Sequence, residues 1–341
     1  MGTSLVQKIE LSLVFFVINV LWFFDDIWYY LKKGILNTIR IFFCLVVIGY
    51  FFKGFYLQPM LGDFSSYTYV LNPNTQSVLG AATNLTEFPF LKNSVPNPVV
   101  TAKAIYVEDI THGKELFSKN KDEKLAPAST TKLMAAIVSL ELYKLDEIIA
   151  IPKACTEIEG QKGGFLEGEK YTVHDLLASM IINSSADAAC ALSVGKIGYF
   201  EFINKMNEKA EEIGLESTSF SNPIGLDDLG GVQFSTAKNL YKLALEARKE
   251  TILKEFVRTT EKQIKSLDGK ESLAVNTNRL LWEVPGTVGI KTGKTEAAGE
   301  VLIYEYNKDG KNFIIVVMGS EDRFTDTKNI LNWVLESYSW N

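Results

Sequence analysis

The chain has 341 residues, which exceeds one average domain without deciding between one large domain and two. Its hydrophobic fraction of 47% and charged fraction of 22% are typical of a folded globular protein and exclude an intrinsically disordered one. The net charge of −6, with no long basic run, argues against nucleic acid as a partner.

Two apolar runs lie near the N-terminus, at residues 11–24 and 41–57. As a helix, the second run is about 25 Å long, enough for a slightly thin bilayer. The first run is shorter and is followed by acidic residues, so it is a second span, a re-entrant piece or an interfacial helix. A buried core helix is the alternative for each. We predict a membrane anchor over residues 1–57, with one or two transmembrane segments.

Basic residues and prolines predict what surrounds this anchor. Lys32, Lys33 and Arg40 precede the second run, and the positive-inside bias keeps such residues cytoplasmic. Everything after residue 57 is therefore expected on the extracytoplasmic face of the cell membrane. Residues 58–98 are polar and proline-rich, which predicts an extended stalk. The apolar residues Phe90 and Leu91 leave open that part of the stalk packs on the following domain.

The remaining residues, 99–341, have the pattern of a compact domain. A strand hairpin is predicted at 104–110 and 115–118. Helical spacing follows at 129–145, 173–194, 199–213 and 236–248. Strands return at 289–295, 301–306 and 313–317, with Asp309-Gly310 as a turn between the last two, and a helix at 325–338 closes the chain. Strands at both ends with helices between them predict one α+β domain whose sheet joins its beginning and end.

Cysteine and histidine are scarce. A structural zinc site is not expected with two histidines and no C-x-x-C pair, and no other metal or cofactor is indicated. We interpret Cys155 and Cys190 as small packing residues, with a disulfide in an oxidising compartment as the alternative. His112 falls in a hairpin turn and His174 at a helix start, neither in the context that a Ser-His-Asp triad requires.

Ser129 and Lys132 form an S-x-x-K pattern at the start of a predicted helix. Residues three apart lie on one face of a helix, with Lys132 one turn deeper than Ser129. The residues that follow are apolar on all sides, which indicates a buried helix. Burial lowers the pKa of a lysine until its neutral amine can take a proton from a hydroxyl. An N-capping serine beside a solvent-reaching lysine is the alternative.

Two further segments add polar groups in sequence order. Lys291-Thr292-Gly293, followed by Lys294 and Thr295, lies on a predicted strand and offers a cation, hydroxyls and close backbone approach to an anionic, extended substrate. An ordinary edge strand is the alternative. The segment from Asn183 to Asp187 lies in a helical context and either adds a polar wall to the pocket or caps a helix.

Together these segments resemble the S-x-x-K, S-D-N and K-T-G elements of the penicillin-recognising serine enzymes. The chain is similar to D-alanyl-D-alanine carboxypeptidases of the low-molecular-weight type over nearly all of residues 99–338. The likeness includes Asn222-Pro-Ile-Gly-Leu226 and Asn276-Thr-Asn-Arg279. It implies a β-lactamase/DD-peptidase-like fold, in which an all-helical subdomain packs on an antiparallel five-stranded sheet with the site in the cleft between them.

The resemblance also implies the catalytic roles. Ser129 would attack the carbonyl of the D-Ala-D-Ala bond, and Lys132 would accept its proton. Ser184, hydrogen-bonded to Lys132 and Lys291, would relay a proton toward the leaving amine. The acyl-enzyme would then be hydrolysed by water, releasing the trimmed peptide.

The same resemblance implies how the substrate is held. Backbone N–H groups of Ser129 and Lys294 would form the oxyanion hole. Thr292, Thr295 and Arg323 would bind the terminal carboxylate, Arg323 by a charge-assisted pair. Peptidoglycan stem peptides would be the substrates and β-lactams covalent inhibitors.

One position departs from the family pattern. The second motif normally reads S-x-N, but Ala186 stands where the asparagine is expected, and that amide would have contacted the peptide group of the substrate and helped to fix Lys132. Its loss weakens catalysis or shifts the role to Asn183 or a water. The open alternatives to a carboxypeptidase are a DD-endopeptidase and a weakened enzyme that only binds wall peptides or penicillin. A β-lactamase is disfavoured because no E-x-x-L-N element is found.

Overall fold

The computed structural model describes residues 89–92, 95–227, 229 and 231–340. The predicted anchor at 1–57 and most of the predicted stalk lie outside these residues. Among the helices that are described, none is both long and apolar enough to cross a membrane. The last part of the predicted stalk is described, and there β1 (Phe90–Leu91) pairs with β11 (Tyr338–Ser339) near the end of the chain.

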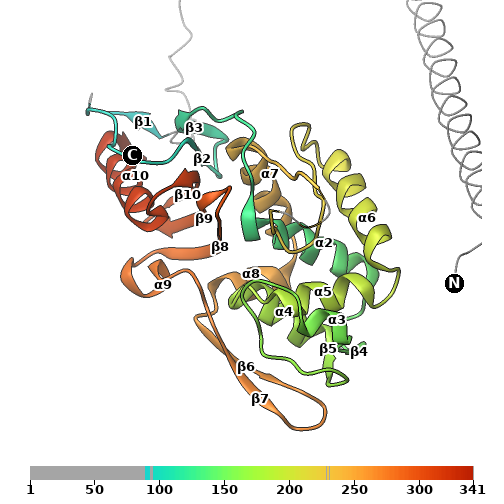
Figure 1. The fold of residues 1–341 in the computed structure, drawn as a ribbon. Coiled ribbons are helices and arrows are strands. Elements are labelled where there is room, and N and C mark those ends of the chain that lie inside the picture. Colours follow the sequence, from blue (N-terminus) through green and yellow to red (C-terminus); the bar gives the residue numbers. More distant parts are fainter. Residues whose placement is uncertain (1–88, 93–94, 228, 230, 341) are drawn as a thin grey trace, which may run out of the picture. The chain divides into compact units, whose positions relative to one another are not determined.

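The central sheet has five antiparallel strands, as the resemblance implies, and their order is β3-β2-β10-β9-β8 (Figure 1). Its strands are β2 (Ala104–Asp109), β3 (Lys114–Lys119), β8 (Thr287–Thr295), β9 (Gly299–Lys308) and β10 (Lys311–Ser320). The predicted first hairpin is confirmed as β2–β3, and the predicted turn at Asp309-Gly310 joins β9 to β10. The sheet therefore brings the start of the domain against its end.

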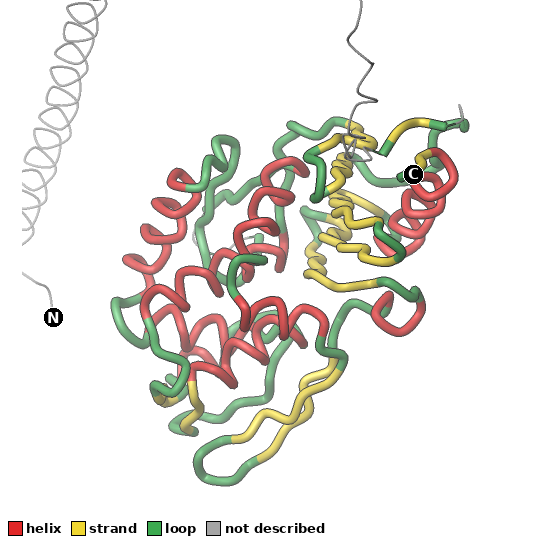
Figure 2. The backbone as a smooth tube through the Cα atoms, turned by 180° about the vertical axis from the view of Figure 1, so that it is seen from behind, coloured by secondary structure: helices red, strands yellow, loops and turns green. Residues whose placement is uncertain are grey.

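Helices cover both faces of this sheet. The α-helices are α2 (Lys132–Leu142), α3 (Lys153–Thr156), α4 (Val173–Ile182), α5 (Ala186–Val194), α6 (Tyr199–Glu212), α7 (Ala237–Ala247), α8 (Thr251–Arg258), α9 (Leu280–Glu283) and α10 (Arg323–Ser337). Figure 2 shows most of them gathered on one side of the sheet, with α10 on the other. Small two-stranded sheets complete the fold: β4 (Ile148–Ala150) with β5 (Lys170–Thr172), and the hairpin of β6 (Glu261–Lys265) with β7 (Glu271–Val275).

Alternation along β10 explains how one strand serves two cores. Phe313, Ile315 and Val317 belong to the core that α10 closes, while Ile314 and Val316 belong to the core beneath the helical side. Neighbouring side chains of a strand point to opposite faces, so a strand buried on both faces is continuously apolar. The apolar run at 313–317, predicted as a strand, is therefore part of β10 and is buried on both faces.

Two predictions differ from the structure. The predicted single helix at 173–194 is two helices, because the chain turns at Ser184, whose φ is 61°, and Ser185 then caps α5 by accepting from the N–H of Ala188. The preference for Cys155 and Cys190 as packing residues is wrong: they form a disulfide, with Cα atoms 5.4 Å apart. Cys155 lies in α3 and Cys190 in α5, so the bond ties these two helices together.

Candidate active site

Ser129 and Lys132 lie where a short 3-10 helix (Ala128–Thr131) leads into α2. The side-chain nitrogen Nζ of Lys132 is 2.9 Å from Oγ of Ser129. Lys132 is 1% exposed, because the apolar residues of α2 carry the start of the helix into the core. The pairing expected from the S-x-x-K spacing is therefore present.

The second partner of Lys132 is a backbone carbonyl from a loop. Nζ of Lys132 donates to the carbonyl oxygen of Ile224 at 2.7 Å. The loop is built by the side-chain oxygen of Asn222, which accepts from the N–H groups of Ile224, Gly225 and Leu226. This bond and the one to Ser129 fix the position of the amine.

Burial sets the protonation of Lys132. Loss of solvent lowers the pKa of its amine from 10.5 to about 7, while the negative charge of Asp187 acts in the opposite direction. A large fraction of the amine is therefore neutral near pH 7, and a neutral amine has the lone pair that a general base requires.

Two glycines allow backbone segments to approach Ser129 closely. A Cβ atom on Gly225, which has φ of 90°, would lie 2.0 Å from the carbonyl oxygen of Ala128. A Cβ atom on Gly293 of β8 would lie 3.0 Å from the backbone nitrogen of Ser129. Any larger residue would push the loop or the strand away, so both glycines are required by packing against the nucleophile.

Strand β8 contributes a second buried amine. Lys291 is 1% exposed, and its Nζ donates to the carbonyl oxygen of Thr292 at 3.2 Å. Burial lowers the pKa of Lys291 well below its ordinary value, and the positive charges of Lys132 and Arg323 lower it further. An anionic ligand nearby would favour the protonated form of this buried amine.

The residues predicted to hold the carboxylate already have partners. Nη1 of Arg323 donates to the carbonyl oxygen of Gly293 at 3.0 Å. The hydroxyl of Thr292 is 2.6 Å from that of Thr277, and the hydroxyl of Thr295 donates to Asp227 at 2.7 Å. In this structure the proton of Thr295 is therefore engaged with Asp227.

Ser184 occupies the turn between α4 and α5 and is buried. Its positive φ of 61° is costly for serine, as is common at sites where function requires an unusual backbone. The expected hydrogen bonds from Ser184 to Lys132 and Lys291 are not formed within the part of the chain that the structure describes. Ser184 nonetheless lines the same pocket as Ser129 and Lys132.

The predicted residues converge on one pocket of about 280 Å³. It is lined by Ser129, Lys132, Ser184, Thr292, Gly293, Lys294, Thr295 and Arg323, all predicted from the sequence, and by Gly160, Gln161, Ile224, Leu226 and Thr277. Of the predicted set, Lys291 lies on the same strand but is not a lining residue. The segments around Ile224 and Thr277 had been noted only as likenesses to the family, and nothing in the sequence had indicated Gly160 or Gln161.

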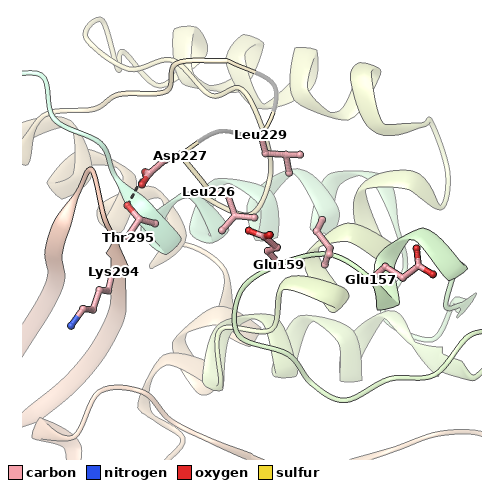
Figure 3. Close-up of a pocket in the computed structure, with 8 residues that line it drawn as sticks. Glu157, Glu159, Leu226, Asp227, Leu229, Lys294 and Thr295 are labelled. Atoms are coloured by element: carbon pink, nitrogen blue, oxygen red, sulfur yellow. Dashed lines mark hydrogen bonds between the residues drawn. The ribbon is translucent and has the colours of Figure 1, made fainter.

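A second hollow of about 520 Å³ shares the walls Leu226, Lys294 and Thr295 with this pocket (Figure 3). Lys294 and Thr295 lie on β8, and Glu157 and Glu159 lie on the loop that follows α3. The site is therefore an elongated depression, suited to an extended chain.

The site thus places a serine hydroxyl beside a buried lysine amine, with Lys294 and Arg323 lining the same pocket. The family model for D-alanyl-D-alanine carboxypeptidases matches residues 91–322. The chain therefore belongs to the D-alanyl-D-alanine carboxypeptidase family of peptidases.

Relatives agree with this assignment. A D-alanyl-D-alanine carboxypeptidase of Bacillus subtilis is 36% identical over 69% of this chain and 62% of its own length. A D-alanyl-D-alanine endopeptidase of Pseudomonas aeruginosa is 30% identical over 75% of this chain and 84% of its own. The crystal structure of the Streptomyces K15 DD-transpeptidase matches with a TM-score of 0.67 and 30% identity, over 71% of this chain and all of that one. The chain thus spans less than two thirds of the Bacillus relative.

Proposed function

We propose that the protein is a serine-type D-Ala-D-Ala carboxypeptidase that removes the terminal D-alanine of peptidoglycan stem peptides. The observation that carries this proposal is the buried amine of Lys132, 2.9 Å from the hydroxyl of Ser129. The family and the names of its relatives support the choice of substrate.

In the acylation step, Oγ of Ser129 attacks the carbonyl carbon between the two D-alanines, and its proton passes to the neutral amine of Lys132. Backbone N–H groups of Ser129 and Lys294 stabilise the oxyanion. When the C–N bond breaks, the leaving amine takes a proton from Lys132 by way of the Ser184 hydroxyl, and D-alanine departs. Water then attacks the ester, with Lys132 again the base, and frees the shortened peptide and Ser129.

The cations around the pocket support the binding of a free carboxylate. Arg323 and the exposed Lys294 line the pocket, and the buried Lys291 lies on the same strand. We propose that Thr292 and Arg323 hold the terminal carboxylate, and that Thr295 joins them only if its bond to Asp227 is exchanged. A carboxylate ligand would partly offset the repulsion among these positive charges.

The test is incubation of the protein with benzylpenicillin, followed by measurement of intact mass. An adduct of one penicillin is expected, absent in Ser129→Ala and retained in the control Ser118→Ala, which removes a hydroxyl on β3. An adduct that survives Ser129→Ala would refute Ser129 as the nucleophile.

A second assay separates the candidate activities. A pentapeptide ending in D-Ala-D-Ala should release D-alanine, whereas a cross-linked dimer should be cut if the chain acts as an endopeptidase, as one relative is named. Adduct formation without release of D-alanine or cleavage of the dimer would instead indicate a protein that only binds its ligand, the alternative raised by Ala186.

We further propose that residues 41–57 anchor the protein in the cell membrane, with the catalytic domain on the extracytoplasmic face. The disulfide between Cys155 and Cys190 supports this placement, because such bonds persist in oxidising compartments. Membrane fractionation of the full-length protein tests the anchor. Protease treatment of intact cells that have no outer membrane tests the orientation. Protection of the catalytic domain from the protease would contradict the proposed orientation.

A further inference from the structure

Ala186 stands where the family pattern has an asparagine, and a neighbouring loop packs over it. Ala186 is the first residue of α5 and its side chain is fully buried. Its backbone N–H donates to the carbonyl oxygen of Gln161 at 2.7 Å. The position is therefore covered by the loop that contains Gln161.

The next residue holds the same loop. The carboxylate of Asp187 accepts from the N–H of Gly163 at 2.8 Å and from the N–H of Gly164 at 3.1 Å. These bonds and the one from Ala186 place the loop over the N-terminal end of α5. The loop position is thus determined by two neighbouring residues of the second motif.

The loop packs closely on the buried side chain of Ala186. A Cβ atom on Gly160, which has φ of 104°, would lie 3.4 Å from Cβ of Ala186. A larger side chain at position 186 would therefore lie next to Gly160 of the loop. The small residue at 186 and the close approach of the loop go together.

We infer that the carboxamide of Gln161 performs the substrate contact that an asparagine at position 186 would otherwise make. Gln161 lines the pocket together with Ser129 and Ser184, and its side chain is exposed there. No side-chain hydrogen bond engages it within the described residues. The NH₂ and C=O groups of its carboxamide are therefore free to bond the peptide group on the acyl side of the scissile bond. This assignment rests on the proposed function.

Asn183 is less suited to this role. Its side-chain oxygen accepts from the hydroxyl of Ser179 at 2.9 Å. It is not among the residues that line the pocket. Its carboxamide is thus engaged in the turn between α4 and α5, whereas that of Gln161 is available.

The test compares two β-lactams that differ in the group to be contacted. Benzylpenicillin carries an acylamino side chain, whereas 6-aminopenicillanic acid has only an amine at that position. Gln161→Ala and Gln161→Met should each slow acylation by benzylpenicillin roughly tenfold, as expected for one lost hydrogen bond, and acylation by 6-aminopenicillanic acid less than about twofold. The control Glu167→Ala, at an exposed position further along the loop between α3 and β5 and outside the pocket lining, should leave both rates unchanged.

Each other outcome is informative. An unchanged rate with benzylpenicillin would overturn the assignment, and so would an equal loss with both compounds, which would indicate a role in loop position alone. If the wild-type protein formed no adduct with either compound, the proposed function itself would fail. The two failures are therefore distinguishable.

Discussion

The rate at which a penicillin acylates Ser129 should fall about tenfold for each pH unit below about 7, because only neutral Lys132 can accept the proton. Burial brings the pKa of this amine from 10.5 to about 7. At pH 7 about half of the molecules then carry the neutral amine, against roughly 0.03% for a solvated lysine. The environment thus raises the active fraction by a factor on the order of 1,000.

The assay is the second-order rate constant for acylation by benzylpenicillin, followed by intact mass between pH 5 and 9. We expect a rise of about 50-fold between pH 5 and pH 7 and a plateau above about pH 8. Lys132→Met should abolish the reaction, while Lys249→Met, which removes an exposed lysine just after the C-terminal end of α7, should keep the same profile. A flat rate below pH 7, or a rise that continues to pH 10, would refute the reasoning.

The same burial has a thermodynamic consequence of known sign. The folded state binds the Lys132 proton less tightly than the unfolded state, so this residue destabilises the protein below pH 7 and ceases to do so as the pH rises toward 10.5. The full penalty is about 5 kcal/mol for the protonated form. Lys132→Met should therefore raise the free energy of unfolding most at pH 6, and its advantage should shrink toward pH 10.

Three other changes should act through packing or chain entropy. Gly225→Ala places a Cβ 2.0 Å from the carbonyl oxygen of Ala128, so it should lower the free energy of unfolding by about 1–3 kcal/mol or more and slow acylation. Wild-type values in chemical denaturation and in the acylation assay would contradict this. Cys155→Ser should lower the free energy of unfolding by about 4 kcal/mol, because it opens a disulfide that closes a loop with a sequence separation of 35. An unchanged unfolding midpoint would contradict this. Ala186→Asn should lower the melting temperature through overpacking of about 1–3 kcal/mol, whereas a melting temperature equal to the wild-type value would show that the loop yields freely.

Several parts of the fold and site follow from the sequence because they depend on local rules. The spacing of Ser129 and Lys132 places both on one face of a helix, and the apolar run of β10 requires a strand covered on both sides. The K-T-G segment lies on β8, at the strand predicted for residues 289–295. Each of these features depends on residues close together in the chain.

Other parts depend on contacts between distant segments and could not be predicted. The periodicity of residues 173–194 continues through Ser184, so the turn there is visible only from the φ that the surrounding packing imposes. The disulfide depends on how close α3 and α5 lie, which the sequence does not state. The packing of the Gln161 loop over Ala186 depends on the N–H groups of Gly163 and Gly164, which donate to the carboxylate of Asp187 more than twenty residues later in the chain.

The charge on the two buried lysines connects these observations. Lys132 and Lys291 lie near enough for the charge of Lys132 to lower the pKa of Lys291, and both amines are fully removed from water. Each positive charge disfavours the other, so the site carries fewer protons at neutral pH than the same residues in solution. A carboxylate bound to Arg323, as proposed, would reverse this trend, because it would offset the positive charge that lowers the pKa of Lys291. Binding of an anionic peptide should therefore be accompanied by proton uptake, while Lys132, held between Ser129 and the Ile224 carbonyl, remains the amine available as a base.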